Sequence, residues 1–369
     1  MNKFSKIYVA GHTGMVGSAL TRKLIHEGYN NLVFTPSNDF DLTDQQTVRD
    51  FFRREKPEYV FLAAAKVGGI LANNQYRAQF IYENLMIQNN IIHESYVSGV
   101  KKLLFLGSSC IYPKNCHQPI MEEYLLTGEL EYTNEPYAIA KISGIKMCES
   151  YNIQYGTNFI SVMPANLYGP NDNYNLETSH VLPALIRKMH LGKCLENNNW
   201  TAIRKDLEKL PVGELDETCT ENMILNYLEK SGIKLLKDND SHKSNRVQLT
   251  LWGSGKPHRE FLHVDDLAEA CLFIMLNVNF IDTVHNDSKN AEIRNAHINV
   301  GTGKDLTIGE LAQIIKEIVG FEGALDWDSR KPDGTYRKLL DVSKINMLGW
   351  KDKIGLREGI SMVYGKYSV

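Results

Sequence analysis

The stretch that decides the fold is Lys6-Ile-Tyr-Val-Ala-Gly-His-Thr-Gly-Met-Val-Gly17, near the start of the printed sequence. Its first residues form a short apolar run that is typical of a buried strand. The glycines that follow permit a tight turn and let backbone N–H groups approach a pyrophosphate at the N-terminus of the next helix. Such glycine-rich turns also occur for purely structural reasons. A strand before the turn and a helix after it favour a dinucleotide-binding loop.

The residues after this loop repeat the alternation of a short apolar strand and a helix. Strands are predicted at residues 6–10, 31–35, 59–63, 102–106 and 159–163. Between them, segment 79–98 places Phe80, Leu85, Ile87, Ile91 and Ile92 on roughly one stripe, which suits a helix packed on a sheet. The pattern predicts an α/β protein with a Rossmann-type, doubly wound parallel sheet.

The alternation breaks at residues 164–170, where a second, smaller α/β region is expected to begin. We expect a dinucleotide-binding domain over residues 1–165 and a mainly substrate-binding region over residues 166–369, some segments of which return to the first domain. Further strands are predicted at 247–252 and 298–300, and further helices at 265–276 and 308–319. Residues 191–246 are polar apart from a helix-like segment at 219–230, and we interpret them as a surface insertion without recognisable chemistry.

Length and charge exclude several classes of protein. The 369 residues suffice for two domains or one large α/β unit. The 41 Lys and Arg against 44 Asp and Glu exclude the general basic surface that non-specific nucleic-acid binding needs. No apolar stretch approaches the ~20 residues of a membrane span. The six scattered cysteines show no metal-ligand spacing. We therefore expect a cytoplasmic protein with no metal site and no nucleic-acid or membrane partner.

A tyrosine and a lysine four residues apart carry the predicted chemistry. Tyr137 and Lys141 lie on one face of a predicted helix, about 5–6 Å apart at Cβ. A nearby cation suits a tyrosine that acts as an acid or base, because the unperturbed pKa of tyrosine is about 10. Ser108 follows the strand at 102–106, where ligands bind in open α/β sheets. A lone Tyr–Lys pair arises often by chance, but together with Ser108 and the glycine loop it predicts a reductase acting on a carbonyl.

Motifs along nearly the whole chain, apart from residues 191–246, resemble one known family. They are Gly107-Ser-Ser-Cys-Ile-Tyr-Pro113, Asn134-Glu-Pro-Tyr-Ala-Ile-Ala-Lys141, Asn166-Leu-Tyr-Gly-Pro170, Ser179-His-Val-Leu-Pro183, Trp252-Gly-Ser-Gly255, Arg259-Glu-Phe-Leu-His-Val-Asp-Asp266 and Lys331-Pro-Asp-Gly334. In this order they resemble the extended short-chain dehydrogenases/reductases, and among them the GDP-L-fucose synthase family. The resemblance implies NADPH-dependent conversion of GDP-4-keto-6-deoxy-mannose to GDP-L-fucose, by epimerisation at C3 and C5 and reduction at C4. We further expect a homodimer.

The resemblance assigns the epimerisation to Cys110 and His180. Inversion of a carbon beside a ketone takes a base on one face and an acid on the other, and both side chains have unperturbed pKa values near enough to neutrality. By position alone, each residue would be interpreted as structural.

The residues themselves and the resemblance together predict a cofactor set and a substrate set. The cofactor set is Gly11, His12, Thr13, Gly14, Met15, Val16, Gly17, Ser37, Asn38, Asp41, Leu42, Leu106, Gly107, Ser109, Lys141, Pro164, Ala165, Asn166, Leu167 and His180. The substrate set is Lys188, Trp252, Arg259 and Asp333. Lys188 and Arg259 suit the phosphate oxygens of a GDP-linked 4-keto sugar.

Several alternatives stay open. Thr13 and Ser37 are neutral where bacterial family members often carry Arg for the 2′-phosphate, so NADH use is an alternative to NADPH. A GDP-4-keto-heptose is an alternative substrate. A nucleotide-sugar 4,6-dehydratase is disfavoured because Ser109, Cys110 and Ile111 stand where such enzymes have an acidic pair. The remaining rivals are a simple 4-epimerase and a non-catalytic dinucleotide sensor.

Overall fold

The structure is a computed structural model that describes residues 1–35, 40–212, 215, 219–236, 246–284, 292–331 and 333–368. The chain divides into two compact units. Unit 1 consists of Met1–Asn171, Glu260–Lys304 and Lys338–Gly355, and unit 2 consists of Asp172–Arg259, Asp305–Arg337 and Leu356–Val369. The chain therefore passes between the units five times. The domain limits expected at 1–165 and 166–369 stay a prediction.

The centre of unit 1 is a six-stranded, parallel sheet with the strand order β10-β5-β4-β3-β1-β2. Its strands are β1 (Ile7–Ala10), β2 (Leu32–Val33), β3 (Tyr59–Leu62), β4 (Lys102–Leu106), β5 (Phe159–Pro164) and β10 (Ile298–Val300). The predicted doubly wound parallel sheet is confirmed. The strand predicted at 31–35 is shorter than expected, because only two residues of this half-buried edge strand pair with β1.

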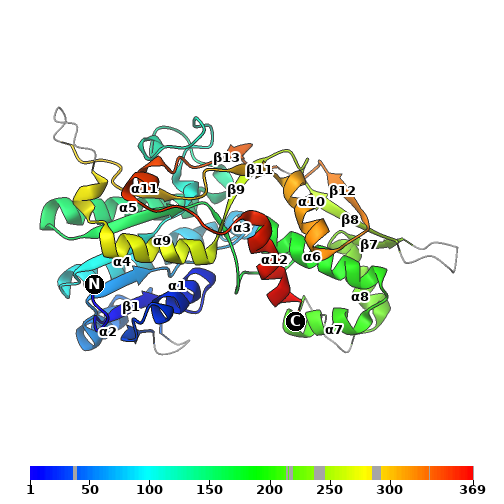
Figure 1. Cartoon of the computed structure of the whole chain (residues 1–369), viewed down its shortest axis with the longest axis horizontal. Helices are drawn as coiled ribbons and strands as arrows, with labels where there is room; N and C mark the ends of the chain where they lie inside the picture. Colours follow the sequence, from blue (N-terminus) through cyan, green and yellow to red (C-terminus); the bar gives the residue numbers. More distant parts are fainter. Residues whose placement is uncertain are drawn as a thin grey trace. The chain divides into compact units, whose positions relative to one another are not determined.

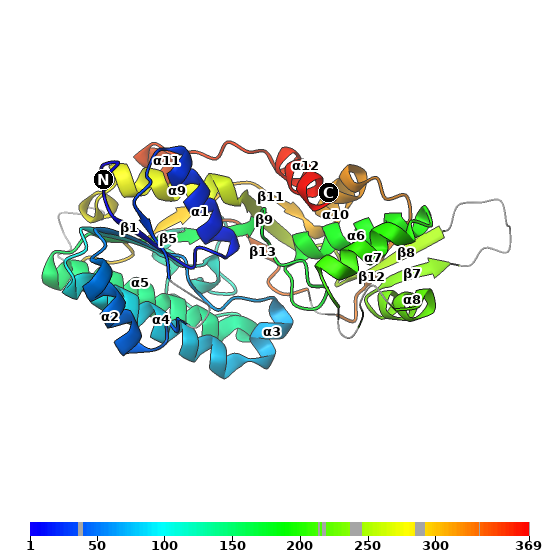
Figure 2. The same cartoon turned by 90° about the horizontal axis from the view of Figure 1, so that it is seen from below.

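Helices cover both faces of this sheet, as Figure 2 shows. One face carries α2 (Gln45–Glu55), α4 (Arg77–Val97) and α5 (Glu135–Tyr155), and the other carries α1 (Met15–His26), α9 (Val264–Asn277) and α11 (Ser343–Leu348). A sheet buried on both faces needs strands that are apolar throughout, which is why β1, β4 and β5 show no polar alternation. The rest of unit 1 comprises α3 (Ile70–Gln75), β6 (Asn166–Tyr168) and the short 3₁₀ helices η1 (Ser109–Ile111), η2 (Glu122–Tyr124), η3 (Tyr132–Asn134) and η4 (Phe280–Thr283).

The glycine-rich loop lies where the strand order reverses. The chain leaves β1 for β2 on one side and then returns to β3 on the other side of β1, which makes the end of β1 the topological switch point. Gly11 has φ +81°, and a Cβ at this position would lie 2.8 Å from the backbone of Ala64, just past the end of β3. Only glycine fits where these two strand ends approach each other.

Unit 2 is built around a three-stranded sheet of β7 (Ile233–Leu236), β8 (Arg246–Trp252) and β12 (Ala324–Asp328), in the order β12-β8-β7. Its helices are α6 (Val181–Glu196), α7 (Trp200–Lys209), α8 (Glu221–Lys230), α10 (Ile308–Val319) and α12 (Leu356–Tyr367), seen in Figure 1. The short strands β9 (His258–His263), β11 (Asp305–Thr307) and β13 (Arg337–Lys338) lie where the chain changes units.

The segment interpreted as a polar surface insertion has its own apolar interior. It forms α7, α8 and β7, which pack with α6 and β8. Ile203, Leu207, Ile224 and Leu228 are fully buried. On amphipathic helices the apolar side chains alternate with polar ones along the chain, so the average composition of the segment hides them.

Some classes of site are absent from the part of the chain that the structure describes. It holds no group of three His, Cys, Asp or Glu side chains placed to bind a metal ion. Among the described helices, none combines the length and the apolar character that crossing a membrane requires. All six cysteines are free thiols.

Candidate active site

The loop after β4 presents the predicted serine and cysteine together. Ser108 caps the 3₁₀ helix η1, and its hydroxyl oxygen accepts a hydrogen bond from the Cys110 backbone N–H over 3.3 Å. Because the oxygen acts as acceptor in this bond, the Ser108 proton stays available to donate to a substrate carbonyl. Gly107, directly before, packs closely against Met163, since a Cβ there would lie 2.3 Å from the end of the Met163 side chain and displace it.

Helix α5 brings the predicted tyrosine and lysine to the same strand end. The Lys141 ammonium donates a 2.9 Å hydrogen bond to the carbonyl of Leu106, the last residue of β4. It lies 5.8 Å from the centre of the Tyr137 ring and 4.8 Å from that of Phe105. The structure thus brings together three residues that the sequence singled out, Ser108, Tyr137 and Lys141.

Electrostatics at this cluster differ from the simplest expectation of a tyrosine acidified by its lysine. Burial, and secondly the nearby Cys110, raise the pKa of Tyr137, while a hydrogen bond with Ser108 opposes the rise. Burial lowers the pKa of Lys141 to about 8. Tyr137 is therefore protonated at neutral pH, which is the form that a proton donor needs.

Cys110 is buried and belongs to the same cluster. Burial raises the pKa of its thiol, and Lys338, a hydrogen bond with Ser108, and Lys141 act in the opposite direction. Sequence analysis missed Lys338, which lies far along the chain and outside every motif. It reaches Cys110 only because the chain returns to unit 1 at residue 338.

The glycine-rich loop fits a dinucleotide. A Cβ at Gly17 would lie 2.0 Å from the Gly11 carbonyl oxygen, so the turn closes only with glycine. The first turn of α1 has no side-chain cap, which leaves backbone N–H groups for an anion. The His12 ring packs at 4.6 Å from Phe34, and its buried Nδ1 has no hydrogen-bond partner among the described residues.

The other predicted cofactor residues lie in loops that follow the strands. Asp41 accepts a 2.8 Å hydrogen bond from the Thr43 backbone, and Asn90 holds the Leu42 carbonyl at 3.0 Å. The Asn166 side chain donates to the Glu260 carbonyl over 2.9 Å, just past the end of β5. Two predicted residues, Ser37 and Asn38, lie outside the described residues. The assignment of the whole set stays a prediction.

His180 and the predicted substrate residues all belong to unit 2, whereas Cys110 belongs to unit 1. His180 occupies the N-cap position of α6 without capping it by its side chain, which is exposed. Despite this exposure, desolvation by the protein around the ring lowers the pKa of His180. The pairing of Cys110 with His180 stays a prediction.

Trp252 and Asp333 lie close together in unit 2. The Asp333 carboxylate accepts hydrogen bonds from the backbone and hydroxyl of Ser254, at 2.7 and 2.8 Å. Trp252 is half exposed at the end of β8, with the Lys331 ammonium 4.9 Å from its ring centre. The exposed ring and the adjacent positive charge can accept a flat, anionic ligand.

Lys188 is buried on α6, which packs against the sheet of β7, β8 and β12. Burial lowers the pKa of its ammonium to about 8, and it makes no hydrogen bond or ion pair with any side chain that the structure describes. Arg259, the other predicted phosphate ligand, donates a 2.7 Å hydrogen bond to the His258 carbonyl.

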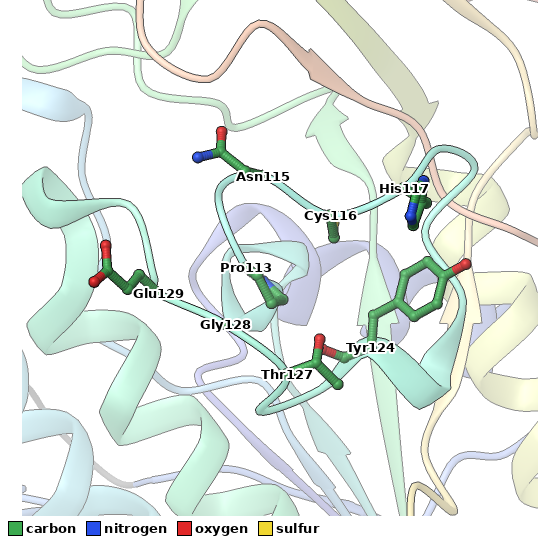
Figure 3. Close-up of a pocket in the computed structure, with 8 residues that line it drawn as sticks. All are labelled: Pro113, Asn115, Cys116, His117, Tyr124, Thr127, Gly128 and Glu129. Atoms are coloured by element: carbon green, nitrogen blue, oxygen red, sulfur yellow. The ribbon is translucent and has the colours of Figure 1, made fainter.

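A separate pocket of about 330 Å³ lies in unit 1, within the loop that follows η1. Its lining residues are Pro113, Asn115, Cys116, His117, Tyr124, Thr127, Gly128 and Glu129 (Figure 3). Cys116 points into it, whereas Glu129 points away. None of the predicted site residues lines this pocket, so it is distinct from the candidate active site.

Comparison with known proteins identifies the family of this chain and several similar proteins. The model of the NAD dependent epimerase/dehydratase family matches residues 7–207 and 222–301. GDP-L-fucose synthase 1 of Arabidopsis thaliana is 49% identical, over 99% of this chain and 94% of the relative. GDP-L-fucose synthase of Escherichia coli K12 is 46% identical, over 97% and 95%. The structure of a GDP-mannoheptose C4 reductase from Campylobacter jejuni with NADP bound is 45% identical, with a TM-score of 0.83 over the whole of both chains.

Proposed function

This chain belongs to the NAD dependent epimerase/dehydratase family and to its GDP-L-fucose synthase branch, and from that premise we propose that it converts GDP-4-keto-6-deoxy-mannose to GDP-L-fucose with NADPH. The observation that carries the proposal is the cluster of Ser108, Tyr137, Lys141 and Cys110 at the carboxyl end of β4.

The reduction uses three residues, Ser108 in the loop after β4 and Tyr137 and Lys141 on α5. NADPH supplies the hydride for C4 of the sugar. The Ser108 hydroxyl donates a hydrogen bond to the carbonyl oxygen, and Tyr137, protonated at neutral pH, gives its proton to the oxygen as negative charge develops there. Lys141, fixed to the Leu106 carbonyl, offsets the charge left on the phenolate.

The epimerisation at C3 and C5 precedes this step, because only the ketone acidifies the neighbouring carbons. Each inversion needs a proton acceptor and a proton donor on opposite faces of the sugar. Burial keeps Cys110 a thiol, and desolvation keeps His180 neutral, so the two side chains together supply one donor and one acceptor at neutral pH.

The nucleotide end of the substrate is held in unit 2. The buried ammonium of Lys188 and the guanidinium of Arg259 bind the diphosphate, and the exposed ring of Trp252 lines the sugar or the guanine. A buried ammonium that has no partner among the described residues is costly, and an anionic ligand offsets that cost.

The two half-reactions give a test that separates the roles. We expect Tyr137→Phe to abolish NADPH oxidation while deuterium from solvent still enters C3 and C5. We expect Cys110→Ser to lose that exchange while ketone reduction continues. NMR of the sugar product and absorbance of NADPH measure both. Normal turnover of Tyr137→Phe would overturn the central assignment, and normal exchange in Cys110→Ser would remove Cys110 from the mechanism. Unchanged NADPH binding by both variants is the control.

Two points of specificity are tested separately. NADPH is the proposed cofactor because the C. jejuni relative binds NADP. Comparison of kcat/KM for NADPH and NADH checks this, and a preference for NADH would contradict it.

The second candidate substrate is a GDP-4-keto-heptose, because the C. jejuni relative is a heptose C4 reductase. If purified enzyme reduces only the heptose when offered both ketones, this second function replaces the first.

We also propose that the protein is a cytoplasmic homodimer. The free state of all six cysteines supports a reducing compartment. Side chains that are apolar and exposed on α4 and α5, among them Val97 and Ile153, support a self-association surface. Light scattering of the purified protein is expected to give twice the chain mass, and a monomer at micromolar concentration would contradict the dimer.

A further inference from the structure

A buried ion pair fastens the insertion to α6. Arg187 on α6 has no exposed surface, and its Nε and Nη2 lie 3.0 and 2.8 Å from one carboxylate oxygen of Asp206 on α7. Nη1 also donates to the carbonyl of Tyr174, at 3.1 Å, and Nη2 to that of Leu210. Asp206 therefore reaches out of the insertion and holds a residue of the helix that carries the predicted phosphate ligand.

A residue of helix α12 also contacts Asp206. The hydroxyl of Tyr367 donates a hydrogen bond to the other carboxylate oxygen of Asp206, and the Tyr367 ring lies 4.7 Å from that of Tyr174. A buried ion pair of this kind adds little stability relative to apolar side chains of the same size. What it supplies is one fixed geometry, because both charges lose their partners if α6 shifts relative to α7.

The residue next to Arg187 is Lys188, which faces another part of the insertion. Gly232, in the turn between α8 and β7, lies so close that a Cβ there would be 3.6 Å from the Lys188 ammonium and 2.6 Å from the Thr250 carbonyl oxygen. The backbone of Thr250 in turn donates to the Gly232 carbonyl over 2.7 Å. The turn at Gly232 therefore lies close to the Lys188 ammonium, while Asp206 fixes its neighbour Arg187.

We propose that α7 and the turn between α8 and β7 form a wall of the diphosphate site and that Asp206 is a positioning residue, which fixes Lys188 by holding Arg187. This inference rests on the proposed function, because it takes Lys188 as a diphosphate ligand. The insertion therefore has a role in the affinity for the nucleotide.

The test measures binding of GDP by calorimetry, with Asp206→Asn as the variant. We expect the Kd for GDP and the KM for the GDP-sugar to rise roughly tenfold, as expected when a ligand group is misplaced, while kcat and the Kd for NADPH stay unchanged. Glu208→Gln is the matched control, since it makes the same change at an exposed position on the same helix, and it should leave all four values unchanged. Unchanged GDP affinity in Asp206→Asn would overturn the proposal.

A second variant guards against unfolding. Arg187→Met combined with Asp206→Leu removes both charges together and leaves no buried charge without a partner. We expect this folded double variant to lose GDP affinity as Asp206→Asn does, whereas wild-type affinity would show that the ion pair is only structural and would overturn the proposal.

A double-mutant cycle separates this inference from the proposed function. If Asp206 acts through Lys188, then Lys188→Met combined with Asp206→Asn binds GDP no more weakly than Lys188→Met alone. Additive losses would overturn the positioning role and leave Lys188 as a ligand. Unchanged GDP affinity in Lys188→Met alone would instead remove the ligand role that the proposed function assigns to it.

Discussion

Lys102, Lys141 and Lys188 are buried lysines whose pKa burial lowers to about 8, yet their surroundings differ. Lys102 and Lys141 donate to backbone carbonyls, which repay part of the cost of burying the charge. Lys188 makes no such bond to the described residues. Of the three, Lys188 is the one poised to bind an external anion.

This contrast predicts a pH dependence of nucleotide binding. The GDP diphosphate attracts Lys188 only in its charged form, so the Kd for GDP should be flat from pH 7 to 7.5 and should rise as the pH passes through about 8. Lys188→Arg should remove this rise, because an arginine stays charged throughout. Calorimetry between pH 7 and 9.5 measures both profiles. A flat wild-type profile up to pH 9.5 would contradict the prediction.

At this scale the sequence predicted the residues whose relation is local and missed those whose relation depends on the fold. The spacing of Tyr137 and Lys141 within one helix was enough to pair them, and Ser108 followed from its place after a strand. Lys338 beside Cys110 had no such signal, because a return of the chain from unit 2 brings it there. Asp206 had no signal either, because the packing of α7 on α6 and not a spacing along the chain brings it to Arg187.

At the scale of elements, two glycines of the β1–α1 turn have different roles: one is needed for folding and the other for cofactor binding. A Cβ at Gly17 would collide with the Gly11 carbonyl oxygen at 2.0 Å, whereas a Cβ at Gly14 would meet it at 3.5 Å, an ordinary contact. Gly17→Ala should therefore lower the thermal midpoint of the protein. Gly14→Ala should keep the midpoint but weaken NADPH binding, because its methyl group stands where a pyrophosphate approaches the helix. Equal midpoints for the two variants would refute the distinction.

The joint between β4 and α9 gives a second prediction. The Lys102 ammonium donates to the carbonyls of Ile274 and Met275 at 2.8 Å and to that of Val278, at the C-terminus of α9. Lys102→Met leaves these carbonyls without their donor and should destabilise the protein by about 2 kcal/mol. Its neighbour Lys101 is an exposed partner of Glu58, so Lys101→Met should cost under about 0.5 kcal/mol. Urea unfolding of both variants measures their free energies of unfolding. Equal values would show that the Lys102 hydrogen bonds to α9 do not stabilise the protein.

Most elements followed from local pattern, and the exceptions have physical causes. Apolar runs with turn signals marked β1, β3, β4 and β5, and α10 has the predicted limits. Strand β2 was predicted too long because pairing at a sheet edge, rather than β propensity, decides where it ends. The helix expected at 219–230 corresponds to α8, whereas α7 was not predicted because its apolar face is buried within a polar segment.

At the scale of the whole molecule, one buried carboxylate holds three segments where the chain changes units. Glu260 accepts hydrogen bonds from the backbone of Thr302 and Gly303 with one oxygen and from that of Leu340, over 2.9 Å, with the other. Burial raises its pKa, while the bonds from Leu340, Gly303 and Thr302 oppose the rise. These residues lie within three positions of three of the five passages between the units.

Loss of this carboxylate should lower the stability of the whole protein. Glu260→Gln turns one oxygen into an N–H₂ group that faces a backbone N–H, so we expect a loss of about 2–3 kcal/mol in the free energy of unfolding. Glu208→Gln, exposed on α7, should change it by less than about 0.5 kcal/mol. Equilibrium unfolding in urea tests both variants. Equal stabilities of the two variants would show that the Glu260 carboxylate does not stabilise these three segments.

The five passages between the units also govern the order in which a growing chain can fold on the ribosome. When residue 171 has emerged, five of the six strands of the parallel sheet exist, but β10, the partner of β5 at its outer edge, is more than 120 residues away. Until then β5 presents an unpaired apolar edge of the kind that recruits other strands. Unit 2 in turn lacks α12, and with it the Tyr367 contact to Asp206, until translation passes residue 367. A chain stalled before β10 therefore leaves both units unfinished, which makes it a substrate for chaperones and proteases rather than a half-active enzyme.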